Sequence, residues 1–519
     1  MGPLTDKIIQ RTISPGIFLA LLFAATVSLA ACGGAVGSLT STPPPSSVQS
    51  LTASDVTTLI QTAAQAADPN TMVIAVVDRA GRVLGVYRKP AAPSLAAGNF
   101  GAQVDVGELA VSLARTGAFF SNDQAPLSSR TVRFISGIHF PPGITGTSNG
   151  PLYGIENTNR GCTLSTDFIA GQAVPPARSI SAATTGLGIT TGKADLNDSD
   201  PNAVNPGGVP LFRNGSLVGG IGVAGVASNV AEYAAFAAAT SNGFGPTPAA
   251  PGVVFINGVA LPFVNQTTQP AGLGAGSFTG SFVVGPSASP GPPPDGMLVT
   301  PAAGPLGGLA ASDVTQIINN AIATANTTRA VIRLPIGSST RMAIAVADLD
   351  GTIIGLYRMA DGTVFSVDVA ATKARNMMYF SGGARTAADL TGVPMGTAVT
   401  NRTIGFGAQP FFPPGIDGSA AGPFFNIYQR DVANPCTQGF QVAGPNQSGI
   451  VFFPGSVPLY RNGALVGGLG VSGDGVDQDD FVASGGSAGF EAPTAIRADQ
   501  VIVQGVRLPY LKFPTNPTN

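Results

Sequence analysis

The chain has 519 residues, with 26 Lys and Arg against 28 Asp and Glu, for a net charge of −2. This length predicts at least two domains, and the lack of a basic surplus argues against nucleic acid as a partner. Only 10% of the residues are charged while 44% are hydrophobic, so we expect a sizeable core rather than wholesale disorder. One His and three Cys exclude a multi-histidine or multi-cysteine metal cage.

Residues 1–31 are typical of a lipoprotein signal peptide. Lys7 and Arg11 make the start positive, and an apolar stretch too short to span a bilayer comfortably follows. It ends in Leu-Ala-Ala-Cys, which resembles the bacterial lipobox, where the thiol is acylated and the peptide is cut before the Cys. We expect export, lipidation at Cys32 and a membrane anchor at the outer membrane or cell surface. An ordinary signal peptide with a chance Cys is the alternative. Residues 32–50 indicate a flexible tether.

The rest of the chain contains two copies of one pattern. We therefore assign repeat 1 to residues 51–264, repeat 2 to 309–519, and a linker rich in Pro and Gly to 265–308. The matching segments, in order, are 51–56 with 309–314, 74–78 with 344–348, 85–88 with 355–358, 104–106 with 367–369, 140–144 with 412–416, 162–163 with 436–437, 210–223 with 458–471, and 257–263 with 504–510.

Each copy predicts the order helix, hairpin, helix, insert, hairpin, helix. Ser54 or Ser312 can cap the first helix, and Asn-Gly turns predict the second hairpin. Hairpins followed by packing helices favour an α+β fold, in which each repeat is an antiparallel sheet built from hairpins and covered by helices. The expected elements are strands 72–77 and 83–88 with their copy in 342–358, second helices near 106–120 and 369–380, turns at 214–215 and 462–463, and third helices near 231–239 and 479–484.

Long irregular inserts separate the second helix from the second hairpin, at about 122–209 and 382–457. Both carry Phe-Pro-Pro-Gly-Ile and one Cys, and their length favours ordered surface structure or a lid. Cys162 and Cys436 are equivalent in the two copies, so a disulfide between them would staple the repeats together in an oxidising compartment. Two buried free thiols are the alternative.

Several short motifs follow one another in a specific order. They are Leu-x-x-Ser-Asp-Val, Ala-Val-x-Asp-x-x-Gly, Tyr357-Arg358-Met359 with Asp361-Gly362, Lys373-Ala374-Arg375, Gly207-Gly208-Val209-Pro210, and the segment 468–473. In this order they resemble the GlcG/HbpS haem-binding family, which includes the C-terminal domain of PduO-type proteins. The resemblance implies haem as a cofactor, or a similar small ligand, and an intramolecular pseudo-dimer that can assemble further into a homo-oligomer. The Lys-Ala-Arg motif of the second helix is incomplete in repeat 1, which has Leu113 where repeat 2 has Lys373.

Candidate ligand residues occur in both copies. A Tyr can ligate ferric haem, and a neighbouring Arg can favour the phenolate or pair with a propionate. The glycines of two Gly-x-Gly-x-x-Gly motifs precede the third helix, where backbone amides can hold an anion. His139 is a candidate iron ligand. For most of these residues packing is the alternative. The candidates are Tyr87, Arg88, Tyr357 and Arg358 on strands, Arg115, Thr116, Lys373 and Arg375 on helices, and Gly222, Gly225, Gly470 and Gly473.

Carboxylates cluster at the start of the last helix, at Asp474, Asp477, Asp479 and Asp480. They either complement the helix dipole or form a weak site for a hard cation.

Three functions remain open. The first is an extracytoplasmic, lipid-anchored protein that binds haem or a similar small ligand without turnover. The second is a cell-surface structural or interaction module that uses the Pro/Phe-rich inserts. The third is a haem-degrading or other enzyme, for which the sequence lacks general acid–base residues in both repeats.

Overall fold

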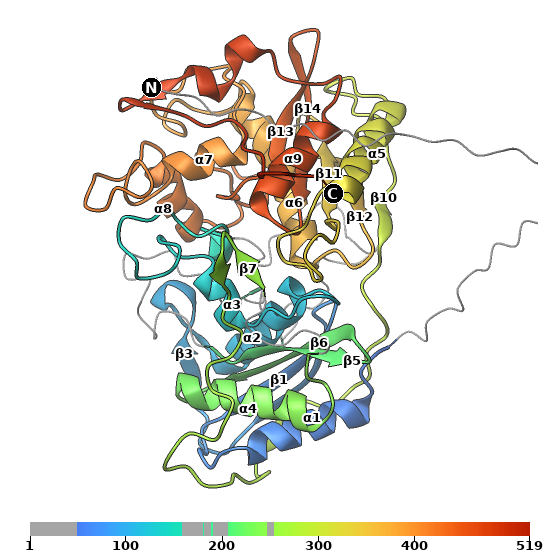
Figure 1. Cartoon of the computed structure of the whole chain (residues 1–519), viewed down its shortest axis with the longest axis vertical. Helices are drawn as coiled ribbons and strands as arrows, with labels where there is room; N and C mark the ends of the chain where they lie inside the picture. Colours follow the sequence, from blue (N-terminus) through green and yellow to red (C-terminus); the bar gives the residue numbers. More distant parts are fainter. Residues whose placement is uncertain (1–48, 158–179, 181–187, 190–205, 247–253, 519) are drawn as a thin grey trace, which may run out of the picture. The chain divides into compact units, whose positions relative to one another are not determined.

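Each repeat is built on one five-stranded antiparallel sheet (Figure 1). The computed structural model describes residues 49–157, 180, 188–189, 206–246 and 254–518. The predicted signal peptide, Cys32, nearly all of the tether and Cys162 lie outside these residues. The strands of repeat 1 run in the order β5 (Gly208–Arg213), β6 (Ser216–Ala224), β1 (Val73–Asp78), β2 (Val83–Arg88) and β9 (Ser281–Val284). Repeat 2 has the matching order β13 (Ser456–Arg461), β14 (Ala464–Ser472), β11 (Ala343–Ala347), β12 (Ile353–Arg358) and β10 (Gly296–Val299).

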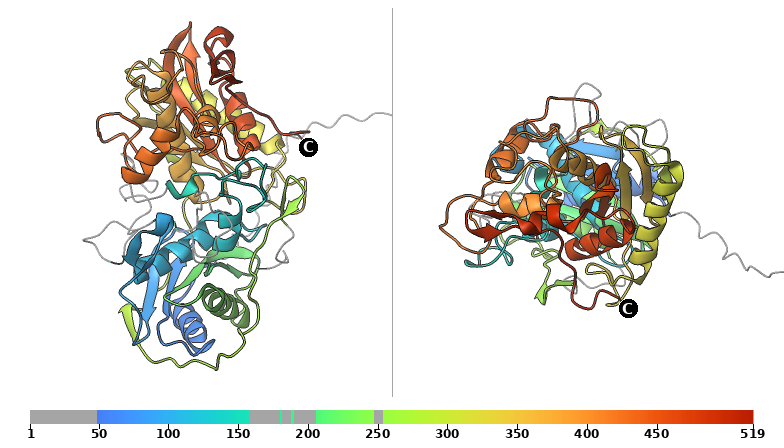
Figure 2. Two further views of the ribbon diagram at one scale, coloured as in Figure 1. Left: turned by 90° about the vertical axis from the view of Figure 1, so that its left-hand side faces the viewer. Right: turned by 90° about the horizontal axis from the view of Figure 1, so that it is seen from above.

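Helices cover both faces of each sheet (Figures 1 and 2). Because side chains alternate along a strand, Ile74 and Val76 pack with the outer helices of repeat 1, while Val73 and Ala75 pack with its inner helix. This arrangement confirms the predicted α+β fold. The outer helices are α1 (Ala53–Gln65) and α4 (Ser228–Ser241) in repeat 1, and α5 (Ala311–Thr327) and α9 (Val476–Gly486) in repeat 2; the inner helices are α2 (Val106–Phe120) and α6 (Phe365–Ser381).

The inner helices lie directly on glycines of the sheet. A Cβ atom on Gly222 would lie 2.0 Å from the carbonyl oxygen of Ala110, and one on Gly470 would lie 2.0 Å from that of Ala370. Any side chain at either glycine would therefore push the helix away. The same contact aligns Ala110 with Ala370, and so fixes which residues of α2 and α6 are equivalent.

This alignment corrects one sequence match and one helix boundary. The two Val-Asp-Val segments are not structurally equivalent: Asp105 is the N-cap of α2 and accepts hydrogen bonds from two amides, whereas Asp368 lies inside the first turn of α6. Taking them as equivalent placed the start of α6 at Val369, but the helix begins at Phe365. The chain enters α6 directly after a short connection, while repeat 1 inserts the ribbon β3 (Leu95–Ala97) and β4 (Gln103–Asp105) before α2.

The N-caps of the first helices are also displaced from the predicted serines. Thr52 caps α1, and the carboxylate of Asp55 accepts a hydrogen bond from the amide of Thr52 at 2.7 Å. In repeat 2 the equivalent cap is Ala310, whose amide is bound by Asp313 at 2.7 Å. The carboxylate three residues into each helix is the feature that both copies retain. Ser54 and Ser312 instead lie in the first turns.

The linker does more than connect the repeats, because it supplies one edge strand to each sheet. β9 pairs with β2, and β10 pairs with β12, both antiparallel. The composition of residues 265–308, which are rich in Pro and Gly, indicated only a linker. The backbone hydrogen bonds of the two short strands come from partners that are distant in the sequence.

The inner helices of the two repeats meet in one hydrophobic core. The ring of Phe120 stacks on that of Phe365, with centroids 4.1 Å apart, and the amide of Val364 donates to the carbonyl of Phe119 at 3.1 Å. Both inserts add to this core: Tyr153 of repeat 1 stacks on Tyr428 of repeat 2 at 5.3 Å. The two copies of the sheet are therefore joined through their inner faces.

The inserts contain short helices, and part of each insert is buried against the rest of the fold. They include α3 (Ser129–Phe134) in repeat 1, and α7 (Asn401–Gly407) and α8 (Phe425–Ala433) in repeat 2. The hydroxyls of Thr131 and Thr403 donate to the carbonyls of Pro262 and Pro509, at 2.6 and 2.7 Å, so α3 and α7 are equivalent. Most described aromatic residues of the inserts lie in or against the shared core. Ile144 and Ile416, at the ends of the Phe-Pro-Pro-Gly-Ile segments, stay exposed.

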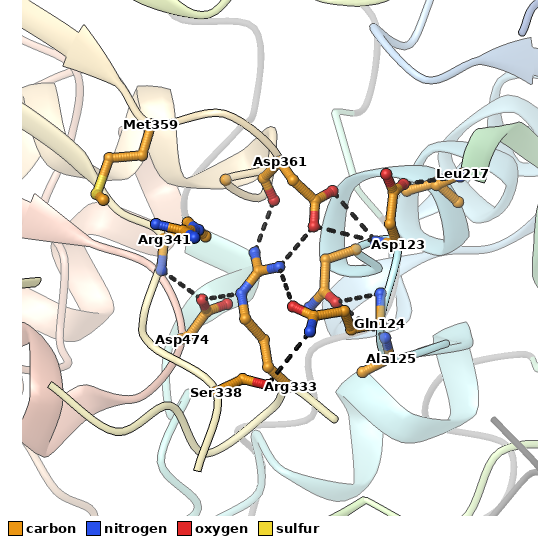
Figure 3. A network of polar contacts seen from close by, with 12 residues as sticks. Asp123, Gln124, Ala125, Leu217, Arg333, Ser338, Arg341, Met359, Asp361 and Asp474 are labelled. Atoms are coloured by element: carbon orange, nitrogen blue, oxygen red, sulfur yellow. Dashed lines mark hydrogen bonds and ion pairs between the residues drawn. The ribbon is translucent and has the colours of Figure 1, made fainter. Parts of the chain in front are cut away.

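A polar network also joins the repeats (Figure 3). Arg333 donates to Asp474 and, at 2.5 Å, to Asp361, and it reaches Gln124 of repeat 1 at 3.1 Å. Asp361 also accepts from Arg79 of repeat 1. Arg333 is 2% exposed and Asp474 is fully buried, so burial raises the pKa of Asp474. The guanidinium of Arg333 is the partner that keeps this carboxylate charged.

Replacing Arg333 with Met should destabilise the protein by about 3–5 kcal/mol, because it leaves the buried carboxylate of Asp474 without its cation. Urea unfolding measures the effect. Arg329→Met is the matched control, since the Arg329 side chain is exposed, and it should change stability by about 0.5 kcal/mol or less. Equal losses in both variants would contradict this role for Arg333.

Candidate functional site

The paired Tyr and Arg candidates point to opposite faces of their sheets, as consecutive strand residues must. Tyr87 packs in the outer core, where its ring stacks on Phe278 at 4.7 Å. Its hydroxyl is buried without a hydrogen-bond partner, and burial raises its pKa. Arg88 instead approaches Asp105 at 3.5 Å. One haem therefore cannot contact both Tyr87 and Arg88, as the hypothesis of a Tyr ligand assisted by its neighbouring Arg required.

In repeat 2 the Tyr is more accessible. Tyr357 is half-buried, and its cross-strand neighbour on β10 is Met297, which is 41% exposed. Arg358 is buried on the opposite face, where it donates to the carbonyls of Gly362 at 2.9 Å and Pro294 at 3.1 Å. Burial lowers the pKa of Arg358 to about 9. Of the two strand tyrosines, Tyr357 is thus the one that retains solvent access.

The Arg candidates of the inner helices hold the first hairpin. Arg115 donates to the carbonyl of Gly81 at 2.9 Å, and Arg375 donates to that of Gly351 at 3.0 Å. Both glycines lie in the turn of the first hairpin, and both Arg side chains are fully buried. Burial lowers the pKa of Arg375 to about 10. The duplicated Arg therefore locks a helix to a turn.

Thr116 plays a local part in its helix. Its hydroxyl donates to the carbonyl of Ser112 at 2.8 Å. The equivalent Asn376 accepts from the side chain of Asn401 at 3.0 Å and from the amide of Val451 at 3.0 Å. This position in repeat 2 therefore binds the insert.

Lys373 is the one candidate that differs sharply between the copies. Its ammonium is fully buried and contacts Asp479 at 3.0 Å and the carbonyl of Val471 at 2.8 Å. Burial raises the pKa of Asp479 to about 7 and lowers that of Lys373. Repeat 1 has Leu113 and Ala231 at these places, both buried. Both members of the buried ion pair of repeat 2 are thus replaced by apolar residues in repeat 1.

The carboxylates near α9 are paired with cations. Asp474 binds Arg333, Asp479 binds Lys373, and Asp480 binds Arg402. Asp477 contacts Arg402 at 2.6 Å and Lys512 at 2.9 Å. Within the described ranges, no group of three or more His, Cys, Asp or Glu side chains is arranged to hold a metal ion. The cluster is therefore a set of ion pairs that fixes the start of α9.

His139 joins the two inserts. Its Nε2 lies 3.0 Å from Oδ1 of Asp417, and Oδ2 of Asp417 accepts from the amide of Gly146 at 2.9 Å. These contacts hold the two Phe-Pro-Pro-Gly-Ile segments together. Cys436 is disulfide-bonded. Its pairing with Cys162 stays a prediction, because Cys162 lies outside the described residues.

The glycines of the Gly-x-Gly-x-x-Gly motifs serve packing. Gly222 and Gly470 lie beneath the inner helices, and a Cβ on Gly225 or Gly473 would lie 2.5 or 2.4 Å from a backbone carbonyl oxygen. Neither motif leaves room at these glycines for a propionate. The candidate residues are therefore divided between two faces of each sheet and do not converge on one pocket. Strand alternation could have revealed this from the sequence, but the buried partners of the helix residues could not be read from it.

Comparison with known proteins finds a family model that matches the second repeat. Residues 309–488 match the family described as haem degrading protein HbpS-like. No curated protein matches the chain. Among solved structures, a PduOC–haem complex is 22% identical, with 35% of this chain and 95% of its own chain covered and a TM-score of 0.23. Protein ORFY of Klebsiella pneumoniae is 19% identical, with 34% and 88% covered and a TM-score of 0.23. A double mutant of Streptomyces reticuli HbpS is 18% identical, with 34% and 83% covered and a TM-score of 0.20.

No helix in the described part of the chain is both long and apolar enough to cross a membrane.

The exchange between the copies predicts how the buried pair behaves. Lys373→Leu or Asp479→Ala alone should cost about 3–5 kcal/mol at pH 8, because each leaves one buried charge unpaired. The double variant copies repeat 1 and should recover most of that loss, as measured by urea unfolding.

The same variants test the pH dependence. The folded-state pKa of Asp479 is raised from 3.8 to about 7, so the folded protein binds this proton more tightly than the unfolded chain. The stability contributed by this group is fully present below pH 3.8 and is lost as the pH rises through about 7. Relative to wild type, the double variant should gain stability across this window. A constant difference would contradict the assignment.

Proposed function

We propose, on the premise that residues 309–488 belong to the HbpS-like family, that this protein binds haem outside the cytoplasm while anchored to a membrane by lipid. The family match carries the proposal, and it lies wholly within repeat 2. We accordingly assign haem binding to repeat 2, and a supporting structural role to repeat 1.

Tyr357 is the residue of repeat 2 that best suits a haem ligand. Bound haem would supply a ferric iron, and the phenolate oxygen of Tyr357 would hold that iron. Tyr357 is half-buried beside the short edge strand β10, whereas Tyr87 is closed off by Phe278 and Phe282 at 4.7 and 5.2 Å. Lys373 and Arg375 do not fit a ligand role, because both are buried against protein partners. The proposed site is thus on the outer face of the sheet.

Haem degradation is the second candidate, because the matched family is described by that activity. We favour binding without turnover. The charged candidates of the inner helices, Arg115, Lys373 and Arg375, are held by an ion pair or by backbone carbonyls. Arg358, the charged neighbour of Tyr357 along the strand, is held by backbone carbonyls on the opposite face. The two functions differ in one measurable way: only degradation consumes the Soret band in the presence of a reductant and oxygen.

Hemin titration tests both the ligand and the residue. Wild type should shift and sharpen the Soret band at one equivalent of hemin, and Tyr357→Phe should abolish the phenolate-to-iron charge-transfer band. Tyr87→Phe is the matched control in repeat 1 and should leave the spectrum unchanged, since Tyr87 is buried.

A Soret spectrum identical to that of free hemin would refute haem binding. Loss of the band with ascorbate and oxygen, faster than for free hemin, would favour the degradation function instead. An unchanged spectrum for Tyr357→Phe would leave haem binding in place and remove Tyr357 as its ligand.

Membrane anchoring depends on the thiol of Cys32. Two or more acyl chains on one residue give stable anchoring, whereas a single chain gives only marginal binding. Cys32→Ser should therefore move the protein from the detergent phase to the aqueous phase in Triton X-114 partitioning. Mass spectrometry of the wild-type N-terminal peptide should show acylated Cys32 as the first residue. An unmodified Cys32, or cleavage elsewhere, would show an ordinary signal peptide.

A further inference from the structure

A cavity of about 330 Å³ lies in repeat 2 beyond the core of the fold. Its volume is at the small end of the range for ligand pockets, about 300–1,000 Å³. Most of its lining comes from the C-terminal extension that follows α9, and the family match ends at residue 488. The lining residues that bear on a ligand are Ser484, Glu491, Arg497, Asp499, Tyr510, Leu511 and Phe513.

The edge of the sheet explains why a space remains here. The amide of Tyr460 on the edge strand β13 donates to the carbonyl of Phe490 at 2.8 Å, which attaches the start of the extension. Pro458 is two residues earlier and has no N–H, so this pairing cannot continue along the strand. The extension then passes through two short helical turns, η3 (Thr494–Ile496) and η4 (Ala498–Gln500). Arg497, between the two turns, and Asp499 of η4 line the cavity.

The residues that line the cavity include positively charged, negatively charged and hydroxyl side chains. Arg497 is fixed by its Nε bond to the carbonyl of Ala492 at 2.9 Å and lies over the ring of Tyr510 at 5.3 Å. Among the described residues, no carboxylate lies within ion-pair distance of the Arg497 guanidinium. Glu491 and Asp499 nevertheless line the same cavity. Residues of both charges thus line one small space. The carboxylate of Glu491 accepts from the amide of Gly489 at 3.0 Å, and that of Asp499 accepts from the side-chain amide of Gln500 at 3.2 Å, so neither is paired with Arg497.

Repeat 1 shows that the hydroxyl groups of the cavity lining are specific to repeat 2. Glu232 of α4 and Asp480 of α9 make equivalent ion pairs with α3 and α7. Along the two helices, Phe236 and Ala239 then correspond to Ser484 and Ser487. Phe263 corresponds to Tyr510, since their carbonyls accept from the capping hydroxyls of Ser128 and Thr400. These three lining positions are therefore apolar in repeat 1.

We propose that this cavity binds a small zwitterion with an apolar side chain, of the size of a free α-amino acid. The ligand carboxylate pairs with the guanidinium of Arg497, whose planar fork suits carboxylates. The ligand ammonium lies towards Glu491 and Asp499, and the apolar side chain packs on Leu511 and Phe513. This site is separate from the haem site and does not depend on it.

Isothermal titration of the full mature protein with L-leucine tests the proposal. Leucine amide lacks the carboxylate and N-acetyl-leucine lacks the ammonium, so each should bind at least about tenfold more weakly than leucine, as expected for a lost charged hydrogen bond. Arg497→Gln should weaken leucine by a similar factor while leaving its weak binding of the amide unchanged.

Two further variants separate binding from folding. Arg507→Gln removes an exposed Arg of the same extension that does not line the cavity, and it should bind leucine like wild type. Ser484→Phe installs the residue of repeat 1 and should block the cavity while preserving the thermal unfolding midpoint. Heats at the level of dilution for wild type with 10 mM leucine, or equal affinities for leucine, its amide and its N-acetyl form, would overturn the proposal.

Discussion

The close approach of the inner helices to glycine-rich strands is the constraint on which the rest of the structure depends. Gly222 and Gly470 allow α2 and α6 to contact the sheet backbone. The opposite sides of these helices are then free to meet each other, as the stacked rings of Phe120 and Phe365 do. With only 10% charged residues, the chain has many apolar side chains to bury, and the inner faces give them a common core.

This arrangement uses the residues that would otherwise be available to a ligand. Arg115 and Arg375 are each fully buried between an inner helix and the turn of the first hairpin. If either Arg turned towards a ligand, the turn carbonyl that it binds would lose its hydrogen bond. The contribution of these Arg side chains is therefore structural. The described parts of the two inserts contact each other, since Tyr153 stacks on Tyr428 and His139 binds Asp417.

The two copies have diverged by coordinated exchanges. Lys373 and Asp479 in repeat 2 correspond to Leu113 and Ala231 in repeat 1, so an ion pair is exchanged for an apolar pair without leaving a lone charge in the core. A second exchange concerns the residues that line the cavity beside the C-terminal extension. Repeat 2 has Ser484, Ser487 and Tyr510 there, where repeat 1 has Phe236, Ala239 and Phe263. Such differences are compatible with one copy that supports the fold and one that carries the binding groups.

The sequence by itself determined the duplication, the α+β class and the positions of the hairpins, because these depend on local patterns. The Asn-Gly turn is an example: Asn214 and Gly215 both adopt the positive φ that their residue types tolerate. Strand alternation likewise separates Tyr357 from Arg358. Only the tertiary structure decided that Arg375 holds a turn, that Lys373 meets Asp479, and that the linker completes both sheets. Those outcomes depend on partners far along the chain, which no local pattern specifies.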